Sequence, residues 1–399
     1  MTDRNTGTFY VPHDIEAPII GASTGPLAGL TAAVKDMYDI AGTRTGGGSP
    51  EWLAARKPAT DHAAVVQKIL DAGATITGKT ICEELFYSMV GVNAHYGMPT
   101  NIRAVGRIPG GSSSGSAAAC GAGACDFAIG SDTAGSIRIP ASFNGIYGHR
   151  STHGRIDLAG AMAMSPTFDA GGWFANGAGM LRRVGQVLLG PGCVAGPVAH
   201  VVVATDMMAQ ADDGIVEVCR TFLTRAKSQL PPLSETPVMP RDFMAWCDAF
   251  RVLQAFEVWQ TFGAFVTSAQ PRLGPGIRER IAFAATVASQ QADSARRVVN
   301  EARSAVQALV PPGTVMLMPT SPAIAPRPEL DGADLDAFRL RVMRLTALAG
   351  LGGLPQVTLP AGTVAGCPVG ISFMGWHGGD EALLDLAFAV GRHCGIAVR

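Results

Sequence analysis

Charged residues and aromatic residues are both scarce in this chain of 399 residues, at 16% and 7%. Basic and acidic side chains nearly cancel to a net charge of −1. The sequence therefore lacks the excess positive charge that a surface for nucleic acid or for anionic lipid requires. We predict no nucleic-acid partner and no membrane partner.

Closely spaced cysteine pairs are also missing. None of the eight cysteines belongs to a Cys-x-x-Cys pair, and the polar stretch 1–5 lacks the apolar core of a signal peptide. Scattered cysteines in a chain of this kind are usually reduced residues of the core. This pattern favours a cytoplasmic location.

A long uninterrupted hydrophobic run is absent as well. The uncharged stretch 345–376 is broken by Pro355, Pro360 and Pro368, with several glycines between them. A membrane-spanning helix needs about 20 consecutive apolar residues with its backbone bonded internally. We therefore interpret this stretch as buried strands joined by tight turns.

Hydrophobic residues, at 47%, and glycine, at 49 residues, are abundant instead. Segments typical of strands and helices mix along the whole chain, which indicates an α/β fold. The main expected strands cover residues 31–34, 74–77, 127–130, 315–318, 356–359 and 370–373, and the main expected helices cover 61–73 and 116–124. No linker separates two domains, so we expect one domain over 1–399, with a motif-bearing core at about 31–175, a variable helical region at about 206–309 and core strands at about 315–399.

Three segments concentrate small and reactive residues. Lys35 follows the apolar strand 31–34, where taken alone it would be a surface lysine. The Gly/Ser loop 110–116 leads directly into an Ala-rich segment, which indicates close backbone approach at the start of a helix rather than a flexible linker. The loop 130–138 is made of small residues, and consecutive backbone N–H groups in such a loop can converge on an anion.

Together these segments resemble the amidase signature family. Its members carry a lysine at the end of an apolar strand and two Gly/Ser loops, and the serines at 112 and 136 have the family's separation of 24 residues (136 − 112 = 24). Further similarity at 140–148, 318–322 and 368–371 extends the resemblance over most of the chain. It implies one compact α/β domain in which helices cover both faces of a large mixed β-sheet.

The resemblance also implies the chemistry, which is cleavage of the C–N bond of a small carboxamide through an acyl-enzyme and without a cofactor. Ser136 would attack the carbonyl carbon, and Lys35 would act as the base through Ser112, which would follow Gly111 on a cis peptide bond. A lysine accepts a proton only when it is neutral, so burial must lower its pKa.

Other residues would support this chemistry. Backbone N–H groups of four consecutive residues would form the oxyanion hole: Thr133, Ala134, Gly135 and Ser136. Ser113 would help to orient Lys35, and Asp132 and Arg138 would hold the loop.

A narrower likeness concerns the substrate. Segments 91–97 and 165–175 look like those of indole-3-acetamide hydrolases and related amidases, which implies a small monoamide such as an arylacetamide. Most of the family has glycine where this chain has Ala134, and the extra methyl group would narrow the acyl side of the site. Several apolar side chains could line either the pocket or the core: Met162, Met164, Phe168, Trp173 and Phe174. A homodimer is compatible with the sequence.

Two motifs suggest other classes of protein. Residues 73–80 match the P-loop pattern G-x-x-x-x-G-K-[ST], but a P-loop follows a strand and leads into a helix, whereas here a helix precedes Gly73. Residues 111–115 match the G-x-S-x-G elbow of α/β-hydrolases, with His149 or His153 as the base, but no apolar strand precedes them. The two histidines also have zinc-ligand spacing, yet no third ligand is evident, so we predict no metal site.

Two further alternatives lie within the family. One is a non-catalytic amidase-like binding module, like those of some organelle import receptors, and the other is a subunit of a tRNA-dependent amidotransferase. The presence of Lys35, Ser112 and Ser136 argues against the first. No segment signals the partner that the second would require.

Overall fold

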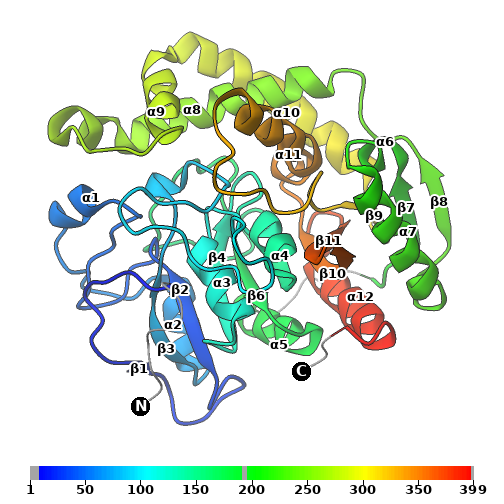
Figure 1. Cartoon of the computed structure of the whole chain (residues 1–399), viewed down its shortest axis with the longest axis horizontal. Helices are drawn as coiled ribbons and strands as arrows, with labels where there is room; N and C mark the ends of the chain where they lie inside the picture. Colours follow the sequence, from blue (N-terminus) through cyan, green and yellow to red (C-terminus); the bar gives the residue numbers. More distant parts are fainter. Residues whose placement is uncertain (1–8, 191–195, 397–399) are drawn as a thin grey trace.

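The computed structural model describes residues 9–190 and 196–396 (Figure 1). The stretch 1–5, for which no signal peptide is predicted, and Cys193 lie outside the described residues. Within these ranges, no helix has both the length and the apolar character needed to cross a membrane.

One mixed sheet of eleven strands runs through the described part of the chain, in the order β1-β3-β2-β4-β6-β5-β10-β11-β9-β7-β8. The pairs β2/β3, β2/β4, β7/β8 and β7/β9 are parallel, and the other neighbours are antiparallel. The strands are β1 (Ile19–Ile20), β2 (Thr31–Lys35), β3 (Thr75–Thr80), β4 (Phe127–Asp132), β5 (Tyr147–Arg150), β6 (Ala170–Ala175), β7 (His200–Ala204), β8 (Leu233–Thr236), β9 (Thr314–Pro319), β10 (Gln356–Val364) and β11 (Cys367–Met374).

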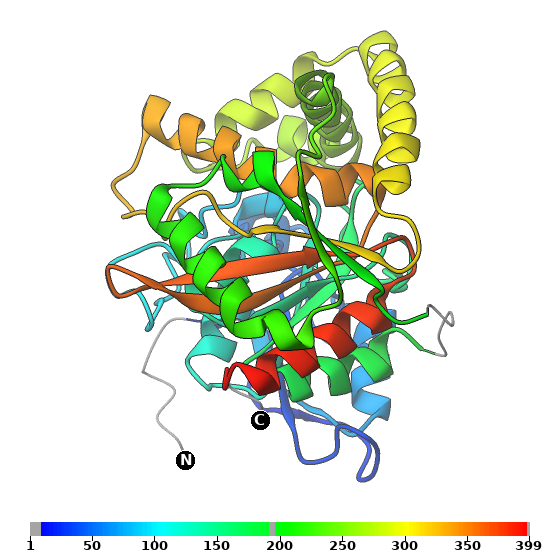
Figure 2. The ribbon, with the colours of Figure 1, turned by 90° about the vertical axis from the view of Figure 1, so that its right-hand side faces the viewer.

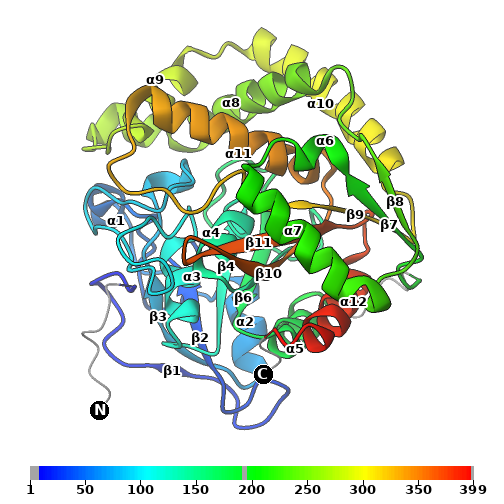
Figure 3. The ribbon, with the colours of Figure 1, turned by 45° about the vertical axis from the view of Figure 1, so that its right-hand side comes forward.

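The helices are α1 (Pro50–Ala54), α2 (Ala64–Asp71), α3 (Ser114–Gly121), α4 (Arg138–Asn144), α5 (Ala178–Leu188), α6 (Thr205–Met208), α7 (Asp213–Ala226), α8 (Phe243–Ala269), α9 (Ile277–Thr286), α10 (Ser289–Leu309), α11 (Gly332–Gly352) and α12 (Asp380–His393), with 3₁₀ turns η1 (Glu84–Phe86) and η2 (Lys227–Gln229). Figures 1 and 2 both place α8, α9 and α10 at one end of the molecule, with α11 between them and the sheet. In Figure 3, α5 and α12 lie side by side against the sheet. The region 206–309 is therefore mainly helical.

Both faces of the sheet are covered. Val34 and Ile129 belong to the large core that α2 and α5 help to form, whereas Ala33 and Ala128 belong to a smaller core built with α3 and α4. Successive side chains of a strand point to opposite faces. The two cores therefore lie on opposite sides of β2 and β4, and the predicted α/β fold with a large mixed sheet is confirmed.

One sequence-based interpretation is wrong. The stretch 345–376 is not strands and turns throughout, because α11 continues to Gly352. Residues 345–352 are all buried, so no polar face marks this part of the helix. The structure agrees with the sequence argument against a P-loop, since Thr75–Thr80 form β3 and Lys79 is buried, with its amine 2.8 Å from the Arg44 carbonyl oxygen.

Candidate active site

Three residues from the predicted motifs form one chain of hydrogen bonds. Lys35 is the last residue of β2, and Ser136 follows the end of β4, which pairs with β2 in parallel. Parallel pairing brings the carboxyl ends of two strands to the same edge of a sheet. The Lys35 amine donates to Ser112 Oγ at 2.9 Å, and Ser112 Oγ donates to Ser136 Oγ at 3.1 Å. The structure thus brings together the three residues for which the sequence predicts the roles of nucleophile, relay and base.

The Lys35 amine is buried next to a second serine hydroxyl and an aromatic ring. It donates a second hydrogen bond to Ser131 Oγ at 2.9 Å and lies 5.0 Å from the centre of the Phe86 ring. Burial lowers the pKa of Lys35 to about 8. Cys82 and neighbouring carboxylates, including Asp169, raise this pKa, but their effect is smaller than that of burial. A substantial fraction of this amine is therefore neutral in mildly alkaline solution.

Ser112 sits where the chain enters α3, and the Gly111–Ser112 peptide bond is cis, as the resemblance implies. The neighbouring Ser113 does not hold Lys35, contrary to the sequence-based expectation. Its hydroxyl donates to the Ser131 carbonyl oxygen at 3.2 Å, and the Ser131 side chain takes the orienting position. Sequence reasoning missed Ser131 because this residue reaches Lys35 only through the pairing of β2 with β4.

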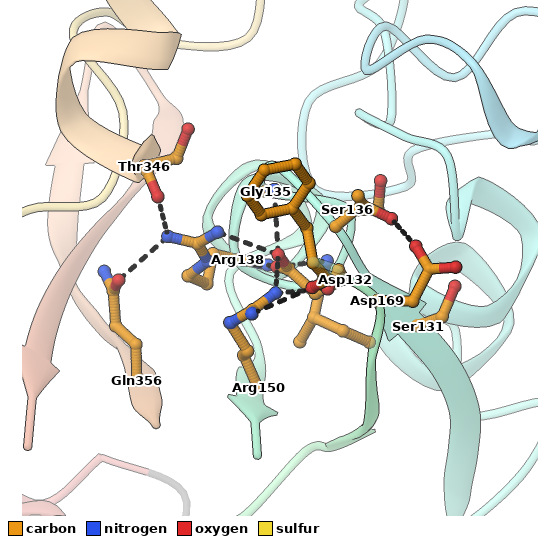
Figure 4. A network of polar contacts seen from close by, with 12 residues as sticks. Ser131, Asp132, Gly135, Ser136, Arg138, Arg150, Asp169, Thr346 and Gln356 are labelled. Atoms are coloured by element: carbon orange, nitrogen blue, oxygen red, sulfur yellow. Dashed lines mark hydrogen bonds and ion pairs between the residues drawn. The ribbon is translucent and has the colours of Figure 1, made fainter. Parts of the chain in front are cut away.

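The loop after β4 is wrapped around the carboxylate of Asp132, with Arg138 and Arg150 converging on it (Figure 4). Arg138 Nη2 lies 2.8 Å and Arg150 Nη1 lies 3.0 Å from Asp132 Oδ1, and the backbone N–H of Ile137 donates to Oδ2 at 3.0 Å. Burial alone would raise the pKa of Asp132, but the Arg138 and Arg150 guanidinium groups hold it well below its usual range. Asp132 and Arg138 thus hold the loop as predicted, and Arg150 is a third member that the sequence did not reveal.

One of the four predicted oxyanion donors is already engaged. The backbone N–H of Gly135 donates to Asp132 Oδ1 at 2.9 Å, so the expectation for this residue is corrected. The N–H groups of Thr133, Ala134 and Ser136 form no hydrogen bond within the described ranges.

A carboxylate that sequence reasoning missed supports the same loop from the side. The Thr133 hydroxyl donates to Asp169 Oδ1 at 2.5 Å, and Asp169 Oδ2 accepts the N–H groups of Met164 and Ser165, each at 2.9 Å. Asp169 therefore ties the loop after β4 to the segment that leads into β6.

A cavity of about 690 Å³ opens beside Ser136 and reaches towards α8, α9 and α11. Its apolar lining includes Phe86, Tyr87, Met89, Met164, Phe283, Leu335, Leu340 and Met343. Its charged lining includes Arg251, Glu279, Arg280, Asp331, Asp336 and Arg339. All five apolar residues left open by the sequence lie in the hydrophobic core, and Met164 also lines this cavity, unlike the other four: Met162, Phe168, Trp173 and Phe174.

The two histidines of the competing α/β-hydrolase hypothesis form contacts away from Ser113. His149 Nε2 lies 3.0 Å from Asp380 Oδ1, and His153 Nε2 lies 2.9 Å from the Pro166 carbonyl oxygen. Neither forms a hydrogen bond with Ser113, so the elbow hypothesis is wrong. In the described residues, no group of three or more His, Cys, Asp or Glu side chains is arranged to hold a metal ion.

Comparison with known proteins agrees with this geometry. A family model described as Amidase matches residues 13–192. The chain is 37% identical to Amidase 1 of Arabidopsis thaliana over an alignment of 416 positions, which covers 96% of this chain and 98% of that protein. It is 33% identical to Outer envelope protein 64, chloroplastic, of the same plant over 388 residues, which cover 90% of this chain and 66% of that protein. Fold, site and relatives define a hydrolase of the amidase class.

The fold of a solved structure agrees as well. The crystal structure of an amidase superposes with a TM-score of 0.83 and 25% sequence identity, covering 92% of this chain and 85% of that one. The chain belongs to the amidase family.

Proposed function

We propose that the protein cleaves the C–N bond of a small carboxamide through an acyl-enzyme on Ser136. The observation that carries this proposal is the unbroken chain from the Lys35 amine through Ser112 Oγ to Ser136 Oγ beside the cavity. Ser136 gives its hydroxyl proton to Ser112, and Ser112 at the same time gives its own proton to neutral Lys35. Ser136 Oγ can then attack the carbonyl carbon. Ser112 then gives a proton to the departing nitrogen, and Lys35 restores it. Water releases the carboxylate by the same steps in reverse order.

The developing oxyanion would be bound by backbone N–H groups. Thr133, Ala134 and Ser136 have N–H groups without a partner in the described residues, and Asp132 and Asp169 fix the loop that carries them. Preorganised donors of this kind stabilise charge that develops in the transition state. Gly135 takes no direct part, because its N–H binds Asp132.

The apolar side of the cavity favours amides with an apolar acyl group, such as arylacetamides. Phe86, Met89 and Met164 line it together with Ala134, whose methyl group would narrow the space next to Ser136. The likeness of segments 91–97 and 165–175 to indole-3-acetamide hydrolases supports the same class. We also propose that the protein acts in the cytoplasm, without ATP, metal or cofactor. The homodimer stays a prediction, which light scattering after size-exclusion chromatography tests.

A second class of substrate is favoured by two arginines of the cavity. Burial lowers the pKa of Arg280 to about 10, and the positive charge of the nearby Arg339 adds to this effect. Arg339 donates to Ser88 Oγ at 3.4 Å and to the exposed Asp336 at 3.2 Å. Two guanidinium groups in one wall would bind a carboxylate. An amide whose acyl group ends in a carboxylate is therefore the second candidate.

The test is ammonia release across a panel of primary amides. The panel contains arylacetamides, aliphatic amides, ureido compounds and half-amides of dicarboxylic acids, with Ser136→Ala as the inactive control. We expect arylacetamides to be hydrolysed by the protein alone. Preference for the half-amides would select the second class, and an absolute requirement for ATP or for another subunit would refute the proposal.

A further inference from the structure

One buried carboxyl near the catalytic loop has no part in the mechanism described so far. Glu83 is 1% exposed and lies just after β3. Its Oε1 accepts the Val90 N–H at 3.2 Å, whereas Oε2 accepts no hydrogen bond of normal geometry from the described residues. A buried carboxyl with an unmatched oxygen is costly, so its position calls for a reason.

The unmatched oxygen lies against the residue that precedes Ser112. A Cβ atom at Gly111 would come within 2.1 Å of Glu83 Oε2, so only glycine fits beside this carboxyl. The N–H of Gly111 donates to the Met89 carbonyl oxygen at 2.9 Å. The carboxyl therefore contacts both the segment that leads into Ser112 and, through Val90, the cavity wall around Met89.

We propose that Glu83 is a positioning residue, whose carboxyl holds Gly111 and thereby Ser112 between Lys35 and Ser136, and whose charge acts on the Lys35 amine. This inference rests on the proposed role of Lys35 as the base. Glu83 touches no reacting atom, and it acts through the segment 110–112 and through the electric field at Lys35.

Several groups set the charge state of this carboxyl. Ser88 and the Gly91 N–H stabilise its anion, and the Arg339 and Arg280 guanidinium groups approach from α11 and α9. Burial outweighs these effects and raises the pKa of Glu83 to about 7.

The direction of the effect on Lys35 follows from these charges. Anionic Glu83 favours the protonated amine and so raises the pKa of Lys35, as do Cys82, Asp169 and Asp132. Removing the charge at position 83 should therefore move the activity limb of Lys35 to lower pH. A role confined to packing would leave that limb in place.

The experiment measures the rate of Ser136 modification by a fluorophosphonate between pH 6 and 10, which requires no knowledge of the substrate. Glu83→Gln keeps the shape and one oxygen acceptor, so we expect a plateau close to that of the wild type and a midpoint lower by about 0.5 unit or more. Glu83→Ala should lower the plateau by about tenfold, because Gly111 loses its support, and should shift the midpoint in the same direction as Glu83→Gln.

Glu84→Gln is the matched control. Glu84 is also 1% exposed, and its Oε1 accepts the N–H groups of Ala94 at 3.2 Å and Gly274 at 3.3 Å, away from Gly111. This variant should keep both plateau and midpoint. A Glu83→Gln midpoint equal to those of the wild type and of Glu84→Gln would overturn the inference.

Glu83→Asp keeps the charge and withdraws the carboxyl from Gly111, and it serves if Glu83→Gln does not fold. We expect the wild-type midpoint with a lower plateau, and a wild-type rate at every pH would contradict the positioning role. Failure of the proposed function is recognised separately, in the wild type, by the absence of label on Ser136 or of a limb near pH 8.

Discussion

At Asp132, a single carboxylate organises the loop that carries Ser136. It is fully buried and is neutralised by Arg138 and Arg150, while its oxygens also accept the N–H groups of Gly135 and Ile137. Arg138 extends the network to the Thr346 carbonyl oxygen and to Gln356 (Figure 4). The loop is thus fixed to α11 and β10, which come much later in the chain.

Asp132→Asn should destabilise the protein by about 3–5 kcal/mol at pH 7, because two buried guanidinium groups lose their counter-charge. The pKa of Asp132 is depressed in the folded protein, so its contribution to stability is present above about pH 4 and is lost as the pH falls towards the folded-state value. Guanidinium unfolding from pH 4 to 8 measures the difference. The exposed pair of Asp248 and Arg251 provides the control.

Asp248→Asn should leave the unfolding midpoint unchanged, since exposed ion pairs contribute little. Equal midpoints for Asp132→Asn and the wild type would show that the Asp132 network does not stabilise the fold.

Lys35 and Ser112 should behave as one unit in catalysis. Lys35→Ala and Ser112→Ala should each lower kcat/KM by about 10²–10⁴-fold, because the proton of Ser136 has no other acceptor. The double variant should be little worse than the worse single variant, since residues that act together are not additive. His153→Ala is the control and should retain the chemical step. Near-normal turnover by Lys35→Ala would be incompatible with the mechanism.

At the scale of elements, the sequence predicted the strands that carry motifs. It did not predict which residues of different elements contact one another. The apolar run before Lys35 predicts β2, and the Gly/Ser loop before the Ala-rich segment predicts the start of α3. Nothing in the sequence of the loop 130–138 sets Ser131 apart from its neighbours, and the pairing of β2 with β4 is what brings it to Lys35. Glu83 carries no motif, and only the fold brings it beside Gly111. The end of α11 was missed because small apolar residues buried on every side show no helical period.

The last helix is anchored to the centre of the sheet by its first residue. Asp380 begins α12, is buried, and accepts hydrogen bonds from the Thr152 N–H at 2.9 Å and the Thr152 hydroxyl at 2.5 Å. His149 Nε2 of β5 lies 3.0 Å from Asp380 Oδ1, the oxygen that also accepts the Thr152 N–H. These contacts join α12 to the strand next to β10.

Asp380→Ala should therefore lower the stability by about 2 kcal/mol or more, because buried donors lose their acceptor. Asp385→Ala on the same helix removes only an exposed pair with Arg182 and should have no measurable effect. Thermal unfolding of both variants makes the comparison. Similar losses for the two would mean that Asp380 does not anchor the helix.

At the scale of the whole molecule, one sheet joins the motif-bearing region to the C-terminal strands. β5 pairs with β10, so strands on either side of the long helical region are direct neighbours. The single domain over 1–399 stays a prediction, and this continuous sheet supports it.

If the chain is one domain, it should unfold in a single transition. Trp173 lies in β6 and Trp259 lies in α8, so tryptophan fluorescence and far-ultraviolet circular dichroism sample both the sheet and the helical end. Their guanidinium transitions should coincide. Separate midpoints would indicate a helical region that unfolds on its own.

The most direct test of the central claim is the site and pH dependence of labelling by a fluorophosphonate in the wild-type protein. Mass spectrometry should find the label on Ser136, and the labelling rate should rise with pH around a midpoint near 8, because Lys35 becomes neutral there. Label on Ser113 with Ser136 free, or a midpoint near the histidine value of about 6.5, would contradict the assignment of Lys35 as the base and Ser136 as the nucleophile.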